Sequence, residues 1–142
     1  MADIRHMIQI AAPADRVYQL VSSGRGFAEW WAQDVTGDGD TAELGFFNRS
    51  TVYHLKRRVD KRPAACEWLC ETGREWLGTR MVFDLEVTAD GTILRFLHSD
   101  WKLETDYFIS CNTTWGELMF RLKAAAEGKS HGPLFRADSL AY

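Results

Sequence analysis

Residues 80–99 read RMVFDLEVTADGTILRFLHS, and this stretch decides the fold. Apolar and polar residues alternate on both sides of Asp90-Gly91, as in two strands that each bury one face. Asp-Gly between two alternating runs is a strong hairpin signal, because glycine takes a positive φ without steric cost. The stretch predicts an antiparallel hairpin with its turn at residues 89–92. The inward positions of its two strands carry Phe83, Phe96 and His98.

An apolar stripe follows the hairpin and predicts a helix. It repeats at spacings of three and four residues, through Phe108, Cys111, Trp115, Leu118 and Leu122. We expect this helix over residues 106–127, as the longest of the chain, with Thr105 or Asp106 capping its start and Gly128 at its end. Packed across the sheet, it would cover the apolar face.

The chain before the hairpin begins with a strand and two short helices. Residues 4–11 alternate as a strand, and Pro13 suits the first turn of a helix over residues 14–22. A second short helix then places three aromatic residues on one face, at positions i, i+3 and i+4. These residues are Phe27, Trp30 and Trp31.

Further strands are expected at residues 44–47, 51–59 and 66–71, the last with Cys66, Trp68 and Cys70 on one face. Strands bracketed by helices form an α+β pattern. The expected fold is a helix-grip: a curved antiparallel sheet of about six strands wrapped on a long C-terminal helix. The length of 142 residues fits one domain over residues 1–142, with an irregular tail at 130–142 whose Leu134-Phe135 pair can dock on the domain.

The composition is that of a globular protein with an excess of aromatic residues. The hydrophobic share is 46% and the charged share 26%, both ordinary, but the chain holds six Trp, eight Phe and four Tyr. Buried aromatic side chains fill cores, and they also line concave sites for small molecules. Both interpretations stay open at this level.

Charge and targeting signals argue against several classes of partner. The formal net charge of −3 argues against a nucleic-acid binder, and the basic cluster at residues 56–62 is expected to be a solvated hairpin end. The sequence shows neither a signal peptide nor an apolar run long enough to cross a membrane. Three cysteines without zinc or redox spacing favour a reduced, cytoplasmic protein without metal or cofactor.

Several motifs together give the chain a family resemblance. They are Ile10 to Trp31 with Pro13, Val17 and the Trp30-Trp31 pair; Trp76-Leu77-Gly78-Thr79; Phe96-Leu97-His98-Ser99-Asp100-Trp101; Cys111-Asn112-Thr113-Thr114-Trp115; and Leu122-Lys123. In this order the chain resembles the START-like (SRPBCC) domains, and within them the subgroup named for the activator of the heat-shock-protein ATPase. The resemblance covers residues 4–128. Asp100 stands where that family often has glycine.

The resemblance implies an apolar cavity between the sheet and the C-terminal helix, and it implies no shared reaction. Of the adjacent tryptophans, Trp30 is expected to face the cavity because it shares a face with Phe27. His98 is interpreted as a hydrogen-bonded core histidine, or as the polar group that orients a ligand together with Asn112. The full set of candidate ligand-binding residues is Trp30, Phe47, Trp68, Phe83, Phe96, His98, Asn112, Trp115 and Met119.

Three functions are compatible with this pattern. The first is a soluble module that binds a small hydrophobic or aromatic molecule in the cavity. The second is an enzyme of the cyclase, dehydratase or hydrolase kind, which would need a carboxylate within hydrogen-bond reach of His98. The third is a co-chaperone-like protein interaction, which would need an exposed apolar patch. A homodimer is left open.

Overall fold

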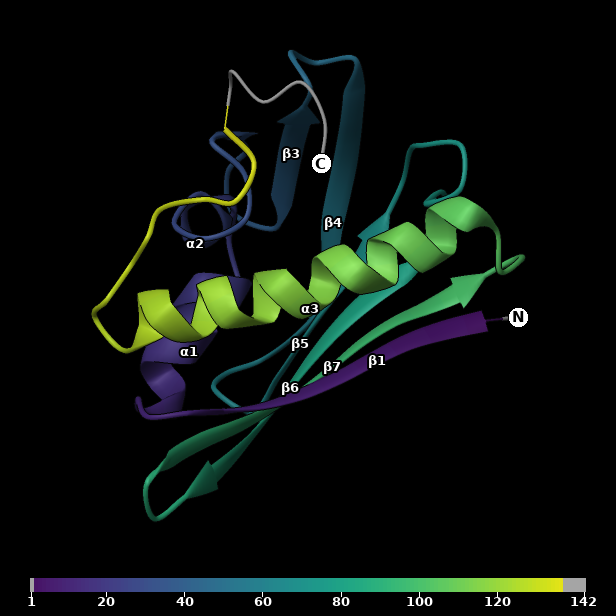
Figure 1. Cartoon of the computed structure of the whole chain (residues 1–142). Helices are drawn as coiled ribbons and strands as arrows, with labels where there is room; N and C mark the ends of the chain where they lie inside the picture. Colours follow the sequence, from purple (N-terminus) through teal and green to yellow (C-terminus); the bar gives the residue numbers. More distant parts are fainter. Residues whose placement is uncertain (1, 137–142) are drawn as a thin grey trace.

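One antiparallel sheet organises the computed structural model, which describes residues 2–136 (Figure 1). Its strand order is β1-β7-β6-β5-β4-β3-β2. The strands are β1 (Ala2–Ile10), β2 (Asp34–Thr36), β3 (Thr41–Phe46), β4 (Thr51–Lys61), β5 (Ala65–Cys70), β6 (Arg80–Thr88) and β7 (Gly91–Trp101). The α+β helix-grip prediction is confirmed. The described part has seven strands where about six were expected, because β2 is only three residues long and too short to alternate.

The predicted β6–β7 hairpin is formed, but its turn is shorter than the expected residues 89–92, because Gly91 and Thr92 already belong to β7. Thr88 pairs with Gly91, so Ala89 and Asp90 make the turn. Gly91 has a φ of 150°, and a Cβ added there would lie 2.2 Å from the carbonyl oxygen of Ile10. Only glycine fits this close approach between the turn and the end of β1.

Three helices accompany the sheet: α1 (Ala14–Val21), α2 (Gly24–Phe27) and α3 (Asp106–Ala126). The longest is α3, as predicted, and it begins where the Thr105 hydroxyl accepts the Phe108 N–H at 3.2 Å. The expected second helix is shorter than predicted. It ends at Phe27, and the chain tightens into a turn in which Trp30 N–H donates to Phe27 O.

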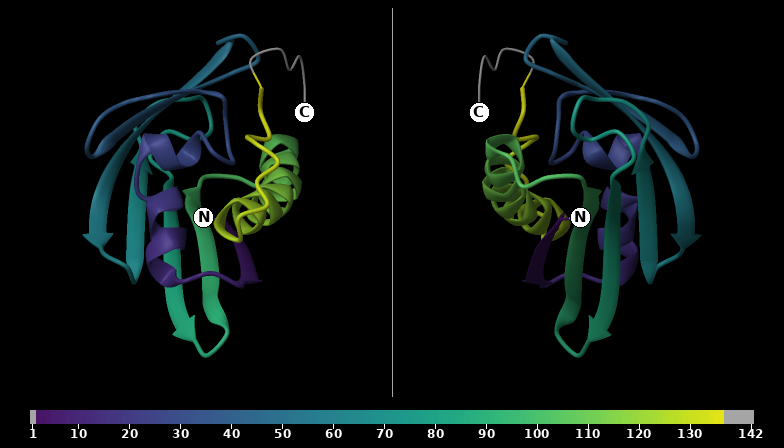
Figure 2. Two further views of the ribbon diagram at one scale, coloured as in Figure 1. Left: turned by 90° about the vertical axis from the view of Figure 1, so that its left-hand side faces the viewer. Right: turned by 90° about the vertical axis from the view of Figure 1, so that its right-hand side faces the viewer.

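The sheet curves around the helices, and α1, α2 and α3 all lie within that curve (Figure 2). Two hydrogen bonds tie the end of α3 to the β1 edge. Lys123 Nζ donates to the carbonyl of Gln9, and Glu127 accepts the N–H of Ala11, both at 2.8 Å. These bonds fix α3 across the sheet. No helix in the described range 2–136 is long and apolar enough to cross a membrane.

After α3 the chain turns back toward α2 and β3 (Figure 1). Leu134 N–H donates to Trp30 O at 3.1 Å, and Phe135 N–H donates to Trp31 O at 3.0 Å. Gln33 N–H in turn donates to Phe135 O at 2.8 Å. The Leu134-Phe135 pair therefore docks on the domain through its backbone. Residues 137–142 of the expected tail lie outside the described residues.

Strand β7 ends in a bend at Asp100, which has a φ of 72°. This left-handed conformation favours glycine, the residue that the resembled family often has there. The Asp100 carboxylate accepts a hydrogen bond from Arg80 Nε at 2.8 Å, and the β1–β7 register shifts alongside it, between Ala2 and Ile4. The residue with the strained backbone is therefore also the residue that forms the ion pair with Arg80.

Two substitutions at this bend separate the backbone effect from the charge. Asp100→Gly and Asp100→Ala both remove the carboxylate that Arg80 contacts. We expect Asp100→Gly to be more stable than Asp100→Ala by about 1 kcal/mol, because alanine pays for the left-handed φ and glycine does not. Urea denaturation of the two variants measures the difference, and equal midpoints would contradict it.

Candidate functional site

A chain of hydrogen bonds runs through the core beneath α3, with His98 of β7 at its centre. Trp115 Nε1–H donates to His98 Nδ1 at 3.1 Å. Because an indole nitrogen only donates, Nδ1 is the acceptor and Nε2 carries the proton. Nε2–H then donates to Thr79 Oγ1 at 2.8 Å, and that hydroxyl donates to the carbonyl of Trp76 at 2.6 Å.

This arrangement makes His98 a neutral structural residue. Burial lowers its pKa to about 3, because the charged imidazolium would lose its hydration. Its ring lies against the rings of Trp76 and Trp101, with centroids 4.7 and 4.8 Å away. Both nitrogens are engaged, by an indole and a hydroxyl and not by a carboxylate, so neither is free for proton transfer.

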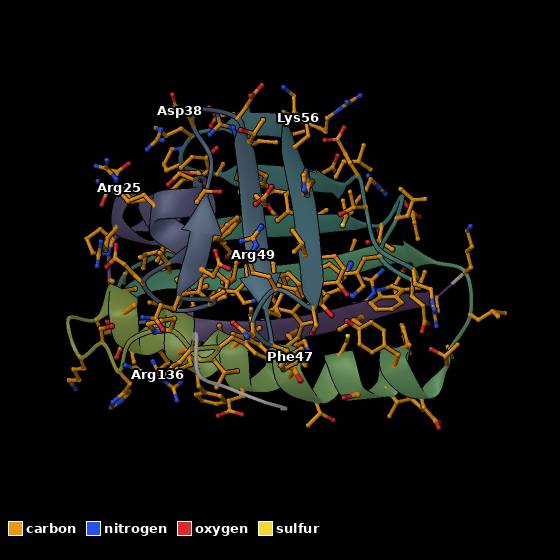
Figure 3. All side chains as sticks on the ribbon, turned by 90° about the horizontal axis from the view of Figure 1, so that it is seen from above. Arg25, Asp38, Phe47, Arg49, Lys56 and Arg136 are labelled. Carbon is orange, nitrogen blue, oxygen red and sulfur yellow. The ribbon has the colours of Figure 1, made fainter. Side chains whose placement is uncertain are left out.

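The open space of this interior is a cavity of about 70 Å³ at the side of the core. It lies between α3, the β3–β4 hairpin and the docked segment, and Phe47 sits where the hairpin meets α3 (Figure 3). Its lining residues are mostly aromatic or small and carry no formal charge. They are Trp31, Phe46, Phe47, Thr51, Tyr53, Trp76, Tyr107, Ser110, Cys111, Thr114, Trp115, Leu118 and Phe135.

Stacked and tilted aromatic rings form the cavity wall. Tyr53 and Trp76 are stacked face to face, with centroids 4.1 Å apart and ring planes 4° from parallel. The ring centroids of Trp31, in the turn after α2, and Trp115, on α3, are 5.0 Å apart. Aromatic pairs at these separations contribute beyond the area that they bury.

Phe135 closes one side of the cavity. Its ring forms edge-to-face pairs with Phe46 and Phe47, with ring centroids 5.0 and 5.8 Å apart. The segment that carries Phe135 belongs to no helix or strand, and backbone hydrogen bonds to Trp31 and Gln33 hold it in place. This wall of the cavity therefore comes from the end of the described chain.

The polar groups of the cavity are neutral. The hydroxyls of Tyr53 and Tyr107 share a hydrogen bond of 2.5 Å, and burial raises the pKa of both phenols. Burial likewise raises the pKa of the Cys111 thiol, to about 11. The Trp76 Nε1–H is buried and has no hydrogen-bond partner among the described residues. At neutral pH the cavity presents N–H, O–H and S–H groups and no ionised group.

Two of the nine candidate residues, Phe47 and Trp115, line this cavity. The expectation for the tryptophan pair is wrong, since Trp31 lines the cavity and Trp30 does not. Helix α1 ends with carbonyls that lack intrahelical partners. Trp30 Nε1–H donates to Leu20 O at 2.8 Å, and Trp68 Nε1–H donates to Val21 O at the same distance. Both indoles are thereby fixed in the core beside α1.

The remaining candidates divide between the core and the surface. Phe83 packs on Phe96 at 5.2 Å, and Phe96 packs on Trp115 at 4.3 Å, so these rings fill the space that was expected to be open. Met119 and His98 are buried beside them without lining the cavity. Asn112 is a correction, because its side chain is exposed on the outer side of α3.

Several lining residues were missed. Tyr107 and Cys111 could have been found by extending the spacing of three and four back from Trp115. Trp76 lies in the loop between β5 and β6, and Phe135 lies in the segment after α3. The sequence pattern marks Trp76 as part of the family motif and Phe135 as part of a docking pair, but neither has a periodic neighbourhood that would place it at the cavity.

The cysteines and histidines form no metal centre within residues 2–136. Cys66, Cys70 and Cys111 are buried as free thiols. Burial raises their pKa values to about 12, 11 and 11, so the thiolate that would bind a metal is disfavoured. Their reduced state in solution stays a prediction.

The neutral state of His98 predicts how stability depends on pH. The unfolded chain binds a proton on this histidine near pH 6.5 and the folded chain only near pH 3, so stability falls as the pH drops through this window. Between pH 7 and pH 5 the free energy of unfolding should fall by about 2 kcal/mol. Urea denaturation at both pH values measures this loss.

Two matched variants assign the effect to His98. The control is His131→Gln, which replaces an exposed histidine and should show the same loss of stability as the wild type between pH 7 and pH 5. His98→Gln is destabilised at neutral pH but should lose most of the pH dependence. An unchanged slope in His98→Gln would contradict the assignment.

Solved structures of other proteins have the same architecture as this chain. A solution structure described as the Aha1 dimer from Colwellia psychrerythraea is 30% identical, covers 91% of this chain and 98% of its own, and superposes with a TM-score of 0.80. The AHSA1-like protein from Aeromonas hydrophila shares 13% identity over 92% of this chain and 96% of its own, with a TM-score of 0.67, and thus the fold alone.

A Bacillus halodurans protein shares the fold at 20% identity and a TM-score of 0.71, over 89% of this chain and 98% of its own. Neither a protein-family model nor a curated protein matches the sequence. The Colwellia relative is aligned over almost the whole of both chains. It has the fold that was expected from the motifs containing Trp76, His98 and Trp115. On that match, this chain belongs to the Aha1-like (AHSA1) family of START-like (SRPBCC) proteins.

Proposed function

We propose that residues 1–142 form a single soluble, cytoplasmic domain that binds a small hydrophobic or aromatic molecule. The observation that carries this proposal is the cavity beside Trp31, Trp115 and Phe135, which has aromatic walls and no charged lining residue. Small-molecule sites are concave and mostly apolar, with a few polar groups that set orientation. The cavity combines these properties in one place.

The size of the cavity limits its ligand. Its volume of about 70 Å³ is roughly half of the 150 Å³ at which an apolar protein cavity binds benzene. An aromatic ring can enter the cavity if the Phe135 side chain moves aside, or if part of the ligand remains outside the cavity. An open groove beside the cavity shares Phe47, Thr51, Tyr53 and Tyr107 with it, which gives a substituent room to extend.

The two alternatives have less support. Acid–base chemistry in this interior would need a free histidine nitrogen with a carboxylate partner, and His98 donates to Thr79 and accepts from Trp115 instead. A co-chaperone-like role is suggested by the name of the Colwellia relative, and the exposed apolar residues on α3 that it would use are assigned below to a dimer interface. The binding function uses the cavity as it stands.

Toluene binding tests the proposal. Saturation-transfer NMR should detect toluene on the wild-type protein, and Phe135→Ala should bind it about 10-fold more tightly, because removing that ring enlarges the cavity toward the benzene-binding size. Val87→Ala, which shortens an exposed side chain on β6, is the control and should match the wild type. If toluene binds neither the wild type nor Phe135→Ala, the proposal fails.

We also propose that the chain forms a homodimer through the outer face of α3. The 30% identical relative is described as a dimer. Ile109 and Phe120 are 57% and 67% exposed, and eleven residues of helix bring them about three turns apart on one face. A second copy could cover this stripe by packing the same face of its own helix.

Analytical ultracentrifugation of a charge variant tests the dimer. Phe120→Lys should raise the dissociation constant of the dimer by at least about 10-fold, because the new ammonium group would be buried against an apolar partner surface. Val87→Lys is the control, since Val87 is 71% exposed on β6, near the hairpin turn. A wild-type monomer at all concentrations, or an unchanged dimer in Phe120→Lys, would contradict this interface.

A further inference from the structure

The Trp76 indole is the unexplained polar group of the cavity. Its side chain is only 4% exposed and lines the cavity, yet its Nε1–H has no hydrogen-bond partner among the described residues. A buried donor without an acceptor costs free energy, so such groups usually have partners in native proteins. The Cys111 sulfur lies close enough to the indole for Trp76 to lower the Cys111 pKa, in opposition to the larger effect of burial, but the contact does not have hydrogen-bond geometry. A thiol sulfur is a weak acceptor, so this contact leaves the Trp76 donor poorly satisfied.

Neighbouring contacts hold the Trp76 ring in this position. One face stacks on Tyr53, and the His98 ring lies nearly perpendicular to the indole, with ring centroids 4.7 Å apart. The backbone carbonyl of Trp76 accepts the Thr79 hydroxyl, which ends the hydrogen-bond chain from Trp115. A ring held by stacking and by its backbone cannot turn easily to find another acceptor.

The other polar groups of the cavity also supply donors. In the Tyr53–Tyr107 pair one hydroxyl donates to the other, and the Cys111 sulfur beside Tyr107 is a weak acceptor for the second O–H proton. The lining residues include no lysine, arginine or histidine, so a buried anion would find no counter-charge. The complementary ligand therefore carries an acceptor without a formal charge.

From these observations we infer that the Trp76 Nε1–H is the group that recognises the ligand, and that the ligand is a flat apolar molecule bearing an uncharged hydrogen-bond acceptor. This inference rests on the proposed binding function and makes Trp76 its specificity-determining residue. Ring stacking gives affinity for any small aromatic molecule. The indole N–H adds affinity only for aromatic molecules that carry a hydrogen-bond acceptor, and so distinguishes them from aromatic hydrocarbons.

An isosteric pair of probes tests the inference. Benzonitrile and phenylacetylene have nearly the same shape, but only the nitrile nitrogen is a good acceptor. Calorimetric titration should show benzonitrile binding the wild type about 10-fold more tightly, because pairing a buried donor has this order of effect. Trp76→Phe keeps an aromatic ring and removes the N–H, so it should abolish the preference.

Two further measurements keep the test independent of variant stability. On the wild-type protein, benzonitrile should move one indole N–H resonance downfield, and the resonance missing from the Trp76→Phe spectrum identifies it. The nitrile stretching band of bound benzonitrile should shift as it does on hydrogen bonding. Benzoate supplies the anionic comparison and should bind more weakly than benzonitrile.

The outcomes separate the inference from the proposed function. Equal binding of benzonitrile and phenylacetylene to the wild type would overturn the role of Trp76 while leaving a binding cavity. A preference that survives in Trp76→Phe would do the same, and tighter binding of benzoate would overturn the uncharged acceptor. Absence of binding by both neutral probes, with toluene also failing, would overturn the proposed function and this inference with it.

Discussion

The hydrogen bond from the Trp115 indole to His98 is the contact on which the rest of the interior depends. It joins α3 to β7, and through Thr79 and the Trp76 carbonyl it extends to the loop between β5 and β6. Three separate parts of the chain are thus held by one continuous set of polar contacts inside an aromatic core. Low local dielectric strengthens such a network and makes each missing partner costly.

The empty space lies beside this network and not within it. Phe96 packs against Trp115, and Phe83 packs against Phe96, so these rings fill the centre of the interior. The cavity is displaced toward the β3–β4 side, where Trp31, Tyr53 and Phe135 surround it. The middle of the interior is therefore filled by packed side chains, and the cavity lies at its side.

The sequence predicts the fold well and the site only in part. Alternation in β6 and β7 and the stripe on α3 are periodic, so they specify which side chains point inward. Whether an inward side chain packs against its neighbours or borders a void depends on contacts between distant elements. The hydrogen bond of Trp30 to the last turn of α1 decided between the two adjacent tryptophans, and nothing in their local sequence encodes it. Trp76 and Phe135 lie outside regular elements, where periodicity gives no information.

The docked segment around Phe135 has a consequence for how the cavity can change. All the strands and helices of the helix-grip lie before Gly128, so the segment that follows is not needed to define the architecture. It nevertheless supplies a wall of the cavity through a short parallel bridge between Ala32 and Phe135. Changes there can reshape the pocket while leaving the sheet and α3 intact. Under the proposed binding function, substitutions in this segment would change which ligands fit without changing the sheet or α3, because the part that determines folding is separate from the part that closes the pocket.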